Sequence, residues 1–279
     1  MELLQTIKEL QAAILNAKSS GKSVGFVPTM GALHQGHLSL VENSVSSCGF
    51  TVVSIFVNPT QFNNPEDLKK YPRTLENDLK LLEPLDVDII FNPSVEEMYP
   101  EVDERIFSFG ALEMVMEGAF RPGHFNGVAQ VVSKLFDMVT PDKAFFGEKD
   151  FQQLAIVKAM VREYNYPVEI VPCPTVREED GLAMSSRNAR LEPNKRASSV
   201  KISEALFKSK HLCKSMTVNE VKDWVINNVN DDPELKVEYF DIVDAINLQS
   251  VSSWDVDSEV VGCIAVFAGK IRLIDNIIY

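Results

Sequence analysis

The feature that most restricts the fold is an alternation between two kinds of segment, from residue 22 to about residue 176. Short apolar runs, often β-branched as in strands buried on both faces, alternate with longer segments of helical spacing. The predicted strands are 23–27, 51–57, 87–91, 143–146 and 168–172, and the predicted helices are 37–47, 66–82, 126–139 and 150–163. This order predicts an α/β fold with a Rossmann-like, doubly wound parallel sheet, in which ligands bind beyond the carboxyl ends of the strands.

A different pattern begins at the polar stretch 177–196, which contains acids and glycine. The segments expected beyond it are helices over 193–210 and 217–229, then KVEYFDIVDA and a closing pair of strands, VVGCIAVFA and KIRLIDNII. Gly269 joins the last two strands in a turn. The sequence therefore predicts a Rossmann-like domain over 1–176 and a smaller α+β domain over 177–279.

Charge and composition exclude several classes of protein. The net charge of −13 argues against nucleic acid as a main partner, because phosphate backbones are bound mostly through clustered Lys and Arg. No window approaches the roughly 18 apolar residues of a membrane span, and the first 18 residues resemble an amphipathic helix rather than a secretion signal. The four cysteines form no C-x-x-C pair, so neither a zinc site nor a disulfide framework is predicted. We expect a soluble, cytoplasmic protein with no membrane partner.

The stretch VPTMGALHQGHLSLV (27–41) places His34 and His37 after the first predicted strand, at the start of a helix. Gly36 lets backbone approach a ligand without a Cβ in the way. The first turn of a helix favours anions through its N–H groups and its dipole. Imidazolium N–H groups at this spacing can donate to phosphate oxygens, so the stretch predicts a polyphosphate site. The alternative is a structural role for both rings.

A second polar cluster, FGEKDFQQ (146–153), follows the strand KAFF. Gly147 leaves space, Lys149 supplies a point charge for phosphate, and Asp150 can cap the next helix or hold a ribose hydroxyl. Gln153 would reach back from the first turn of that helix. The alternative is an ordinary helix start with a solvated lysine.

Two further clusters complete the candidate site. After the second strand, Asn58 and Gln61 of NPTQF can hold a small polar substrate by neutral hydrogen bonds. The motif MSSRN (184–188) places two hydroxyls and a guanidinium on an acidic, glycine-containing loop, although such a sequence is also common on surfaces. Together with the histidines it predicts a mobile cationic lid over 177–188, which orders when a triphosphate binds.

In combination, these motifs resemble a known family. Six of them follow one another as in pantothenate synthetases (pantoate–β-alanine ligases), members of a nucleotidyl transferase superfamily with a His-x-Gly-His signature: PTMGALHQGH, FVNPTQF, PEDLKKYPRT, EGAFRPGHFNGVAQVVSKLF, FGEKDFQQL and MSSRN. The resemblance extends to the terminal GKIRLIDN. It implies an AMP-forming ligase that condenses (R)-pantoate with β-alanine through a pantoyl adenylate. It also implies ATP as a substrate, Mg²⁺ bound to ATP, and a homodimer.

The resemblance implies a role for each matching residue. His37 corresponds to the residue usually assigned as proton donor, and His34 to its phosphate-contacting companion. Domain 1–176 would bind ATP and pantoate, and 177–279 would act as a lid. The implied catalytic residues are His34, His37, Lys149, Ser185, Ser186 and Arg187. The implied ATP contacts are Met30, Gly31, Ala32, Leu33, His34, Gln35, Gly36, His37, Gly147, Glu148, Lys149, Asp150, Val176, Met184, Ser185, Ser186 and Arg187. The predicted pantoate contacts are Asn58, Gln61 and Gln153, and Gln61 is also placed toward β-alanine. No protein ligand of Mg²⁺ is predicted.

Two positions depart from the family pattern or vary within it. Gln35 lies between the two histidines, where members of the family vary. Gln130 stands where Thr is expected, which puts only the local packing in question. The same motif carries Arg121 and His124, which either bind a ligand or form an irregular helix entry.

Two alternative functions share these motifs. A nucleotidylyltransferase that transfers AMP to a phosphorylated acceptor has the same His turn. It would need a second basic pocket, whereas NPTQF and FQQ offer neutral amides. A nucleotide-binding module without catalysis would bind ATP and leave it intact.

Overall fold

The computed structural model of the protein describes residues 1–63 and 65–279. The chain forms two compact units, and each of them is assembled from separate stretches of sequence. The first unit contains Met1–Phe109, Arg121–Glu148 and Ile156–Pro174, and the second contains Gly110–Phe120, Lys149–Ala155 and Thr175–Tyr279. Two short segments inside the range 1–176 thus belong to the second unit.

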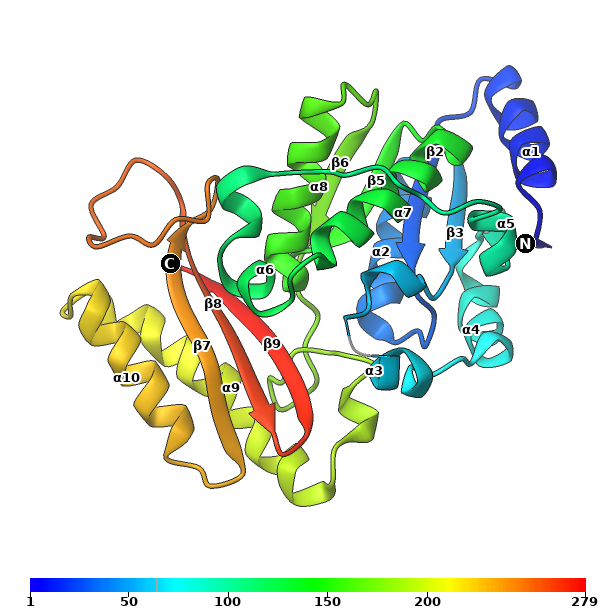
Figure 1. The fold of residues 1–279 in the computed structure, drawn as a ribbon. Coiled ribbons are helices and arrows are strands. Elements are labelled where there is room, and N and C mark those ends of the chain that lie inside the picture. The colour runs from blue at the N-terminus through cyan, green and yellow to red at the C-terminus, as the bar shows by residue number, and fades with distance from the viewer. Residues whose placement is uncertain (64) are drawn as a thin grey trace. The chain divides into compact units, whose positions relative to one another are not determined.

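The first unit is built on a six-stranded parallel sheet with the order β1-β4-β3-β2-β5-β6 (Figure 1). Its strands are β1 (Glu2–Leu4), β2 (Val24–Thr29), β3 (Phe50–Ile55), β4 (Ile89–Phe91), β5 (Lys143–Gly147) and β6 (Glu169–Cys173). From β2 the chain winds outward through β3 to β4, and then continues on the other side of β2 with β5 and β6. The winding reverses between β2 and β5, which is the switch point at which doubly wound sheets bind ligands. The predicted fold class is confirmed.

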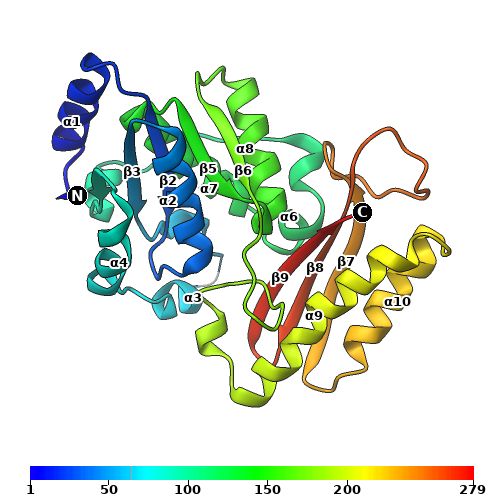
Figure 2. The ribbon, with the colours of Figure 1, turned by 180° about the vertical axis from the view of Figure 1, so that it is seen from behind.

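Helices cover both faces of this sheet. The helices of this unit are α1 (Ile7–Ser19), α2 (Gln35–Ser47), α3 (Pro65–Lys70), α4 (Leu75–Leu82), α5 (Val95–Met98), α7 (His124–Val139) and the later part of α8 (Phe151–Glu163). On one face, Val27 of β2 shares a core with Leu38 and Val41 of α2. On the other, Phe26 meets Phe136 of α7 edge to face, with ring centroids 6.3 Å apart. The two opposite views in Figure 1 and Figure 2 show α7 and α2 on opposite faces of the sheet. Because side chains alternate along a strand, a continuous apolar run supplies both cores.

Two predicted helices of the first unit differ from the structure. The amino terminus begins with strand β1, paired with β4, and helix α1 starts only after Thr6, whose hydroxyl accepts a hydrogen bond from Glu9 N. The predicted helix 66–82 is two helices, α3 and α4. Pro72 lies between them, and its ring nitrogen has no N–H with which to continue a helix.

The second unit is built on a three-stranded antiparallel sheet, β7 (Leu235–Asp244), β8 (Val260–Ala268) and β9 (Ile271–Ile278). Helices α9 (Pro193–Leu212) and α10 (Val218–Asn230) cover one face, where Ile264 packs in a core with Val225. Against the other face lie α6 (Met116–Phe120) and the start of α8, where Cys263 packs in a cluster with Met116. The predicted hairpin at Gly269 is confirmed. No helix within 1–63 and 65–279 is long and apolar enough to span a membrane.

Candidate active site

The first part of the candidate site lies at the carboxyl edge of the parallel sheet, at the switch point between β2 and β5. β2 ends at Thr29 and leads into the turn 30–34, and the adjacent β5 ends at Gly147. The predicted His turn therefore follows β2, and Gly147 of the predicted FGEKDFQQ cluster ends the neighbouring strand β5. This edge is the position at which a doubly wound sheet binds ligands.

The turn 30–34 has a backbone that few residues allow. Gly31 has φ of +77° and Ala32 has φ of +50°, both in the left-handed region. A Cβ on Gly31 would lie 3.0 Å from Oδ2 of Asp78, so conformation and space both favour glycine there. The Gly31 N–H donates to Oγ1 of Thr29 at 3.2 Å, and that hydroxyl donates to a main-chain carbonyl of β3 at 2.7 Å. The turn is thus fastened to the sheet.

Asp78, in the first turn of α4, holds the same turn from the other side and was not anticipated from the sequence. Its buried carboxylate accepts the N–H of Ala32 at 3.0 Å and of Leu33 at 2.9 Å, and the hydroxyl of Thr74 lies at 3.2 Å. A buried charge is tolerated when donors of this kind compensate its lost hydration. In the sequence Asp78 is one acid in an ordinary helix, and no local spacing connects it to a turn 45 residues away.

His34 and His37 begin helix α2 as a linked pair. His34 is the N-cap, and its Nδ1 accepts the N–H of Gly36 at 3.2 Å, while Nδ1 of His37 accepts the N–H of His34 at 3.3 Å. The ring centroids are 4.1 Å apart. A backbone N–H can only donate, so both Nδ1 atoms are acceptors and carry no proton. The arrangement therefore holds neutral rings, rather than the imidazolium groups expected from the sequence.

The neutral rings define what this part of the site can do chemically. An imidazole that accepts through Nδ1 carries its proton on Nε2, so each ring is a donor at Nε2. The first turn of α2 adds the positive end of the helix dipole. Such donors suit a phosphate group, which brings its own negative charge.

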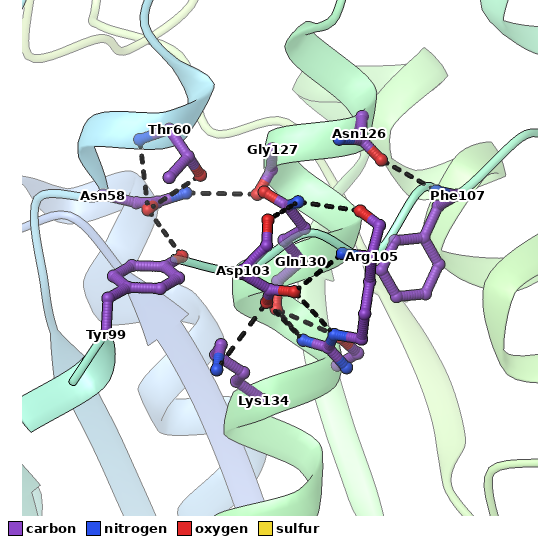
Figure 3. Close-up of polar contacts among 11 residues, drawn as sticks. Asn58, Thr60, Tyr99, Asp103, Arg105, Phe107, Asn126, Gly127, Gln130 and Lys134 are labelled. Carbon is purple, nitrogen blue, oxygen red and sulfur yellow. Dashed lines mark hydrogen bonds and ion pairs between the residues drawn. The ribbon is translucent and has the colours of Figure 1, made fainter. Parts of the chain in front are cut away.

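Gln61 and Asn58 form a buried amide pair after β3. Nε2 of Gln61 donates to Sδ of Met30 at 3.1 Å, which ties this pair to the His turn. Asn58 donates to Oε1 of Gln61 at 3.3 Å. It also donates to the carbonyl of Gly127 at 3.1 Å, and its Oδ1 accepts from the Tyr99 hydroxyl at 2.9 Å (Figure 3). Asn58 is only 1% exposed, and both ends of its amide are engaged within the protein. Asn58 thus supports Gln61, and its contact with pantoate stays a prediction.

His124 also supports Gln61 from helix α7. Its ring is 6% exposed, and Nδ1 lies 2.9 Å from the main-chain oxygen of Gln61. One turn later, Gly127 passes so close to the carbonyl of Thr60 that a Cβ would overlap with it. His124 and Gly127 of the EGAFRPGHFNG motif therefore pack α7 against the Gln61 turn, as residues of a helix entry do.

Gln130 and Asp103 anchor the extended segment 100–109 on helix α7. Nε2 of Gln130 donates to the carbonyls of Asp103 at 2.9 Å and Arg105 at 2.8 Å (Figure 3). The Arg105 guanidinium donates to both carboxylate oxygens of Asp103, at 2.9 and 2.7 Å. This hydrogen bonding lowers the pKa of Asp103 from 3.8 to about 2. Gln130 thus has a clear packing role at the position where Thr was expected.

The depressed pKa of Asp103 predicts a pH-dependent contribution to stability. Because the folded-state pKa lies below the unfolded one, the contribution is fully present above about pH 4 and is lost as the pH falls toward about 2. In Asp103→Asn, the free energy of unfolding should depend less steeply on pH over that window. Urea titrations of both proteins at a series of pH values measure this, and equal slopes would contradict the assignment.

The second part of the candidate site belongs mostly to the second unit. Glu148, Lys149 and Asp150 form a short 3₁₀ turn that leads into α8, and Gln153 lies in the first turn of that helix. Lys149 is half-buried and Asp150 is exposed. Across the described ranges, 1–63 and 65–279, no group of three or more His, Cys, Asp or Glu could hold a metal ion.

The 177–188 loop carries Ser185, Ser186 and Arg187. A main-chain hydrogen bond joins its two sides, and ion pairs attach it to α9. The Met184 N–H donates to the carbonyl of Val176 at 3.0 Å. Arg196 of α9 binds the carboxylates of Glu178 at 2.7 Å and Asp180 at 2.8 Å. That this loop is mobile without nucleotide stays a prediction, which hydrogen exchange with and without ATP would test.

Comparisons with known proteins follow the same motifs across the chain. The family model for pantoate-beta-alanine ligase matches residues 2–278. The pantothenate synthetase of Bacteroides thetaiotaomicron is 60% identical over 279 residues, covering 100% of this chain and 99% of its own length. The crystal structure of pantothenate synthetase from Thermus thermophilus matches with a TM-score of 0.93 and 45% identity over 99% of each chain. The pantoate-beta-alanine ligase of Francisella tularensis, crystallised with beta-gamma ATP and beta-alanine, matches with a TM-score of 0.83 and 35% identity, over 100% of this chain and 97% of its own. The chain therefore belongs to the pantoate–β-alanine ligase family.

Proposed function

We propose that this ligase joins (R)-pantoate to β-alanine in two steps, using ATP. A carboxylate oxygen of pantoate attacks the α-phosphorus of ATP, the bond from that phosphorus to the bridging oxygen breaks, and pyrophosphate leaves. The amine of β-alanine then attacks the acyl carbon of pantoyl adenylate and loses a proton, the acyl C–O bond breaks, and AMP leaves. Esterification to AMP gives the carboxylate a good leaving group, so no covalent intermediate with the protein is needed.

The observation that carries this proposal is the neutral histidine pair at the switch point. Both rings are held through Nδ1, at 3.2 and 3.3 Å from backbone nitrogens, so the proton on each Nε2 is fixed in direction. Donors that are already oriented stabilise charge building up on phosphate oxygens without reorganising during the reaction. We assign His34 and His37 to ATP phosphates through Nε2, and we propose that the rest of the turn, residues 30–36, contacts the nucleotide.

The remaining residues take roles that fit their chemistry. Asn58, Gln61 and Gln153 are proposed to bind pantoate, and Gln61 also to face β-alanine, because neutral amides can pair with hydroxyls and with one carboxylate. Gly147, Glu148, Asp150, Val176 and Met184 are proposed nucleotide contacts. Lys149, Ser185, Ser186 and Arg187 are proposed to stabilise the phosphate charge.

Mg²⁺, dimerisation and location complete the proposal. Mg²⁺ dehydrates reluctantly and is bound largely by phosphate oxygens and waters, so we propose that it enters on ATP. We also propose that the protein is a homodimer, as the resemblance to the family implies. We propose that it acts in the cytoplasm, where ATP and the two small acids are both present.

An oxygen-transfer experiment tests the two-step route directly. The protein is incubated with ATP, Mg²⁺, β-alanine and pantoate labelled with ¹⁸O in its carboxylate. One labelled oxygen per turnover should appear in AMP, because the attacking carboxylate oxygen stays on the α-phosphorus when the acyl C–O bond breaks. Amounts of AMP and pantothenate should be equal.

Other outcomes identify the alternatives. An adenylate that persists in a stable product would indicate a nucleotidylyltransferase. ATP that is bound but never cleaved would indicate a binding module. Formation of ADP with the label in inorganic phosphate, or of AMP without label while the amide forms, would overturn the adenylate.

A further inference from the structure

The terminal motif GKIRLIDN (269–276) has no role in the proposed function, yet its polar side chains contact segments that carry predicted site residues. The motif forms most of strand β9, at the edge of the antiparallel sheet in the second unit. Arg272 and Asn276 lie on the face that packs against α6 and α8, and Asp275 lies on the face that packs against α9. All contacts described below are within the second unit.

Asn276 holds the turn that carries Lys149. Its side chain is 7% exposed, and Nδ2 donates to the main-chain oxygen of Lys149 at 3.0 Å. The main-chain N–H of Asn276 donates to Oδ1 of Asp275 at 2.8 Å, so the backbone at Asn276 helps to hold the Asp275 carboxylate. Because this bond reaches the backbone of Lys149, it fixes the point from which the ammonium extends and leaves that ammonium to act elsewhere.

Asp275 holds the base of the 177–188 loop. Its carboxylate is 4% exposed and binds the guanidinium of Arg177 through both oxygens, at 2.7 and 2.9 Å. The same guanidinium donates to the main-chain oxygen of Gly181 at 3.1 Å and stacks over Phe207 at 4.8 Å. A bidentate pair of this kind is directional, so it fixes the orientation of the loop as well as its position.

Arg272 extends the same pattern to the start of α8. It binds Glu117 through two nitrogens, at 2.8 and 2.6 Å. The N–H of Glu117 donates to Oε1 of Gln152 at 2.9 Å, and Gln152 is the neighbour of Gln153. The motif therefore reaches the Lys149 turn, the 177–188 loop and the Gln153 helix start.

We propose that Asp275 and Asn276 are positioning residues, which set the spacing between Lys149 and the 177–188 loop so that both can act on the same phosphates. The inference rests on the proposed function, because that function assigns Lys149 and Ser185 to Arg187 to ATP. A β-strand suits this task, since successive side chains point to opposite faces and one dipeptide can hold two segments in fixed register. Neither side chain needs to contact substrate.

The test compares two isosteric variants with matched controls. Asn276→Asp removes the donor to Lys149, and Asn247→Asp makes the same change in the exposed turn after β7. Asp275→Asn weakens the pair with Arg177, and Asp241→Asn makes the same change in an ion pair of β7 with Lys222, where Nζ and Oδ1 are 2.5 Å apart. Folding of all four is checked by thermal melting. If Asp275→Asn does not fold, the comparison of Asn276→Asp with Asn247→Asp alone decides the outcome.

Two reactions are measured separately for each folded variant. The first is pantoate-dependent exchange of pyrophosphate into ATP, which reports adenylate formation. The second is conversion of preformed pantoyl adenylate and β-alanine to pantothenate. A misplaced phosphate-binding group should slow exchange by about tenfold or more and raise the KM for ATP, with little change in the second reaction. The controls should match the parent in both.

The outcomes separate the inference from the function on which it rests. A parent protein that shows no exchange would overturn the proposed function itself. A parent that exchanges, with Asn276→Asp indistinguishable from Asn247→Asp, would overturn the positioning role alone. An equal loss in both reactions would also overturn it, because a purely structural defect lowers both in proportion to the folded fraction.

Discussion

Replacing His37 by glutamine should lower adenylate formation by about 10²-fold or more while the start of helix α2 stays intact. The ring has two separable tasks: its Nδ1 accepts the N–H of His34 in a capping box, and its Nε2 carries the donated proton. Glutamine is a regular partner at the third position of a capping box, so it can take over the first task. The glutamine side chain cannot place an N–H at the position of the histidine Nε2. The measurement is pantoate-dependent exchange of pyrophosphate into ATP.

His37→Ala provides the comparison, because alanine loses both tasks. We expect about 1 kcal/mol less stability than the parent from the lost cap, and the same loss of exchange as in His37→Gln. Glutamine should restore the free energy of unfolding without restoring the rate. If His37→Gln exchanged pyrophosphate at the parental rate, the ring would be a cap and nothing more.

The fold was predictable because its signal is local. Each buried strand is a short apolar run, and each helix has its own periodicity, so the order of elements follows from the chain itself. The two wrong element predictions also have local causes. Strand β1 is three residues long, beside a strong helix, and Pro72 divides a pattern whose apolar spacing continues across it.

The candidate site was predictable only as far as its residues follow strand ends in sequence. His34, Gln61 and Lys149 are conspicuous because a turn after a buried strand rarely needs such side chains. The protonation of the histidines was not predictable, since it depends on which nitrogen accepts a backbone N–H. The hydrogen-bond partners of Asn58 were not predictable either, because its amide bonds to residues distant in sequence, such as Tyr99 and Gly127.

Supporting residues are the hardest to find from sequence, because their partners are far away along the chain. Asn276 and Lys149 are 127 residues apart, and Asp78 and Ala32 are 46 apart. Each supporting residue binds main-chain atoms of a site segment. Its bond therefore does not depend on which side chains that segment carries. A motif search therefore finds the residues that are expected to contact a ligand and misses the residues that position them.

Asp78→Asn should show the largest combined effect on stability and activity outside the residues assigned to ligands. The carboxylate accepts two backbone N–H groups, from Ala32 and Leu33, and an amide has only one oxygen to offer. One of these N–H groups would then face an NH₂ group, which should cost about 2 kcal/mol in the free energy of unfolding. The turn would also shift, and a displacement of about 1 Å in a phosphate-binding turn can cost about 10²-fold in rate.

Asp88→Asn is the matched control for this prediction, since it changes a carboxylate that also accepts a main-chain N–H, but at the amino edge of the same sheet. Oδ2 of Asp88 accepts the N–H of Thr51 at 2.8 Å, next to the amino end of β3, away from the turn 30–34. Its loss should lower stability, with exchange per folded molecule unchanged. Asp78→Asn should instead lower exchange even at temperatures where the variant is fully folded. Parental exchange in folded Asp78→Asn would show that the turn keeps its shape without the carboxylate, and that its left-handed residues at 31 and 32 are set by sequence alone.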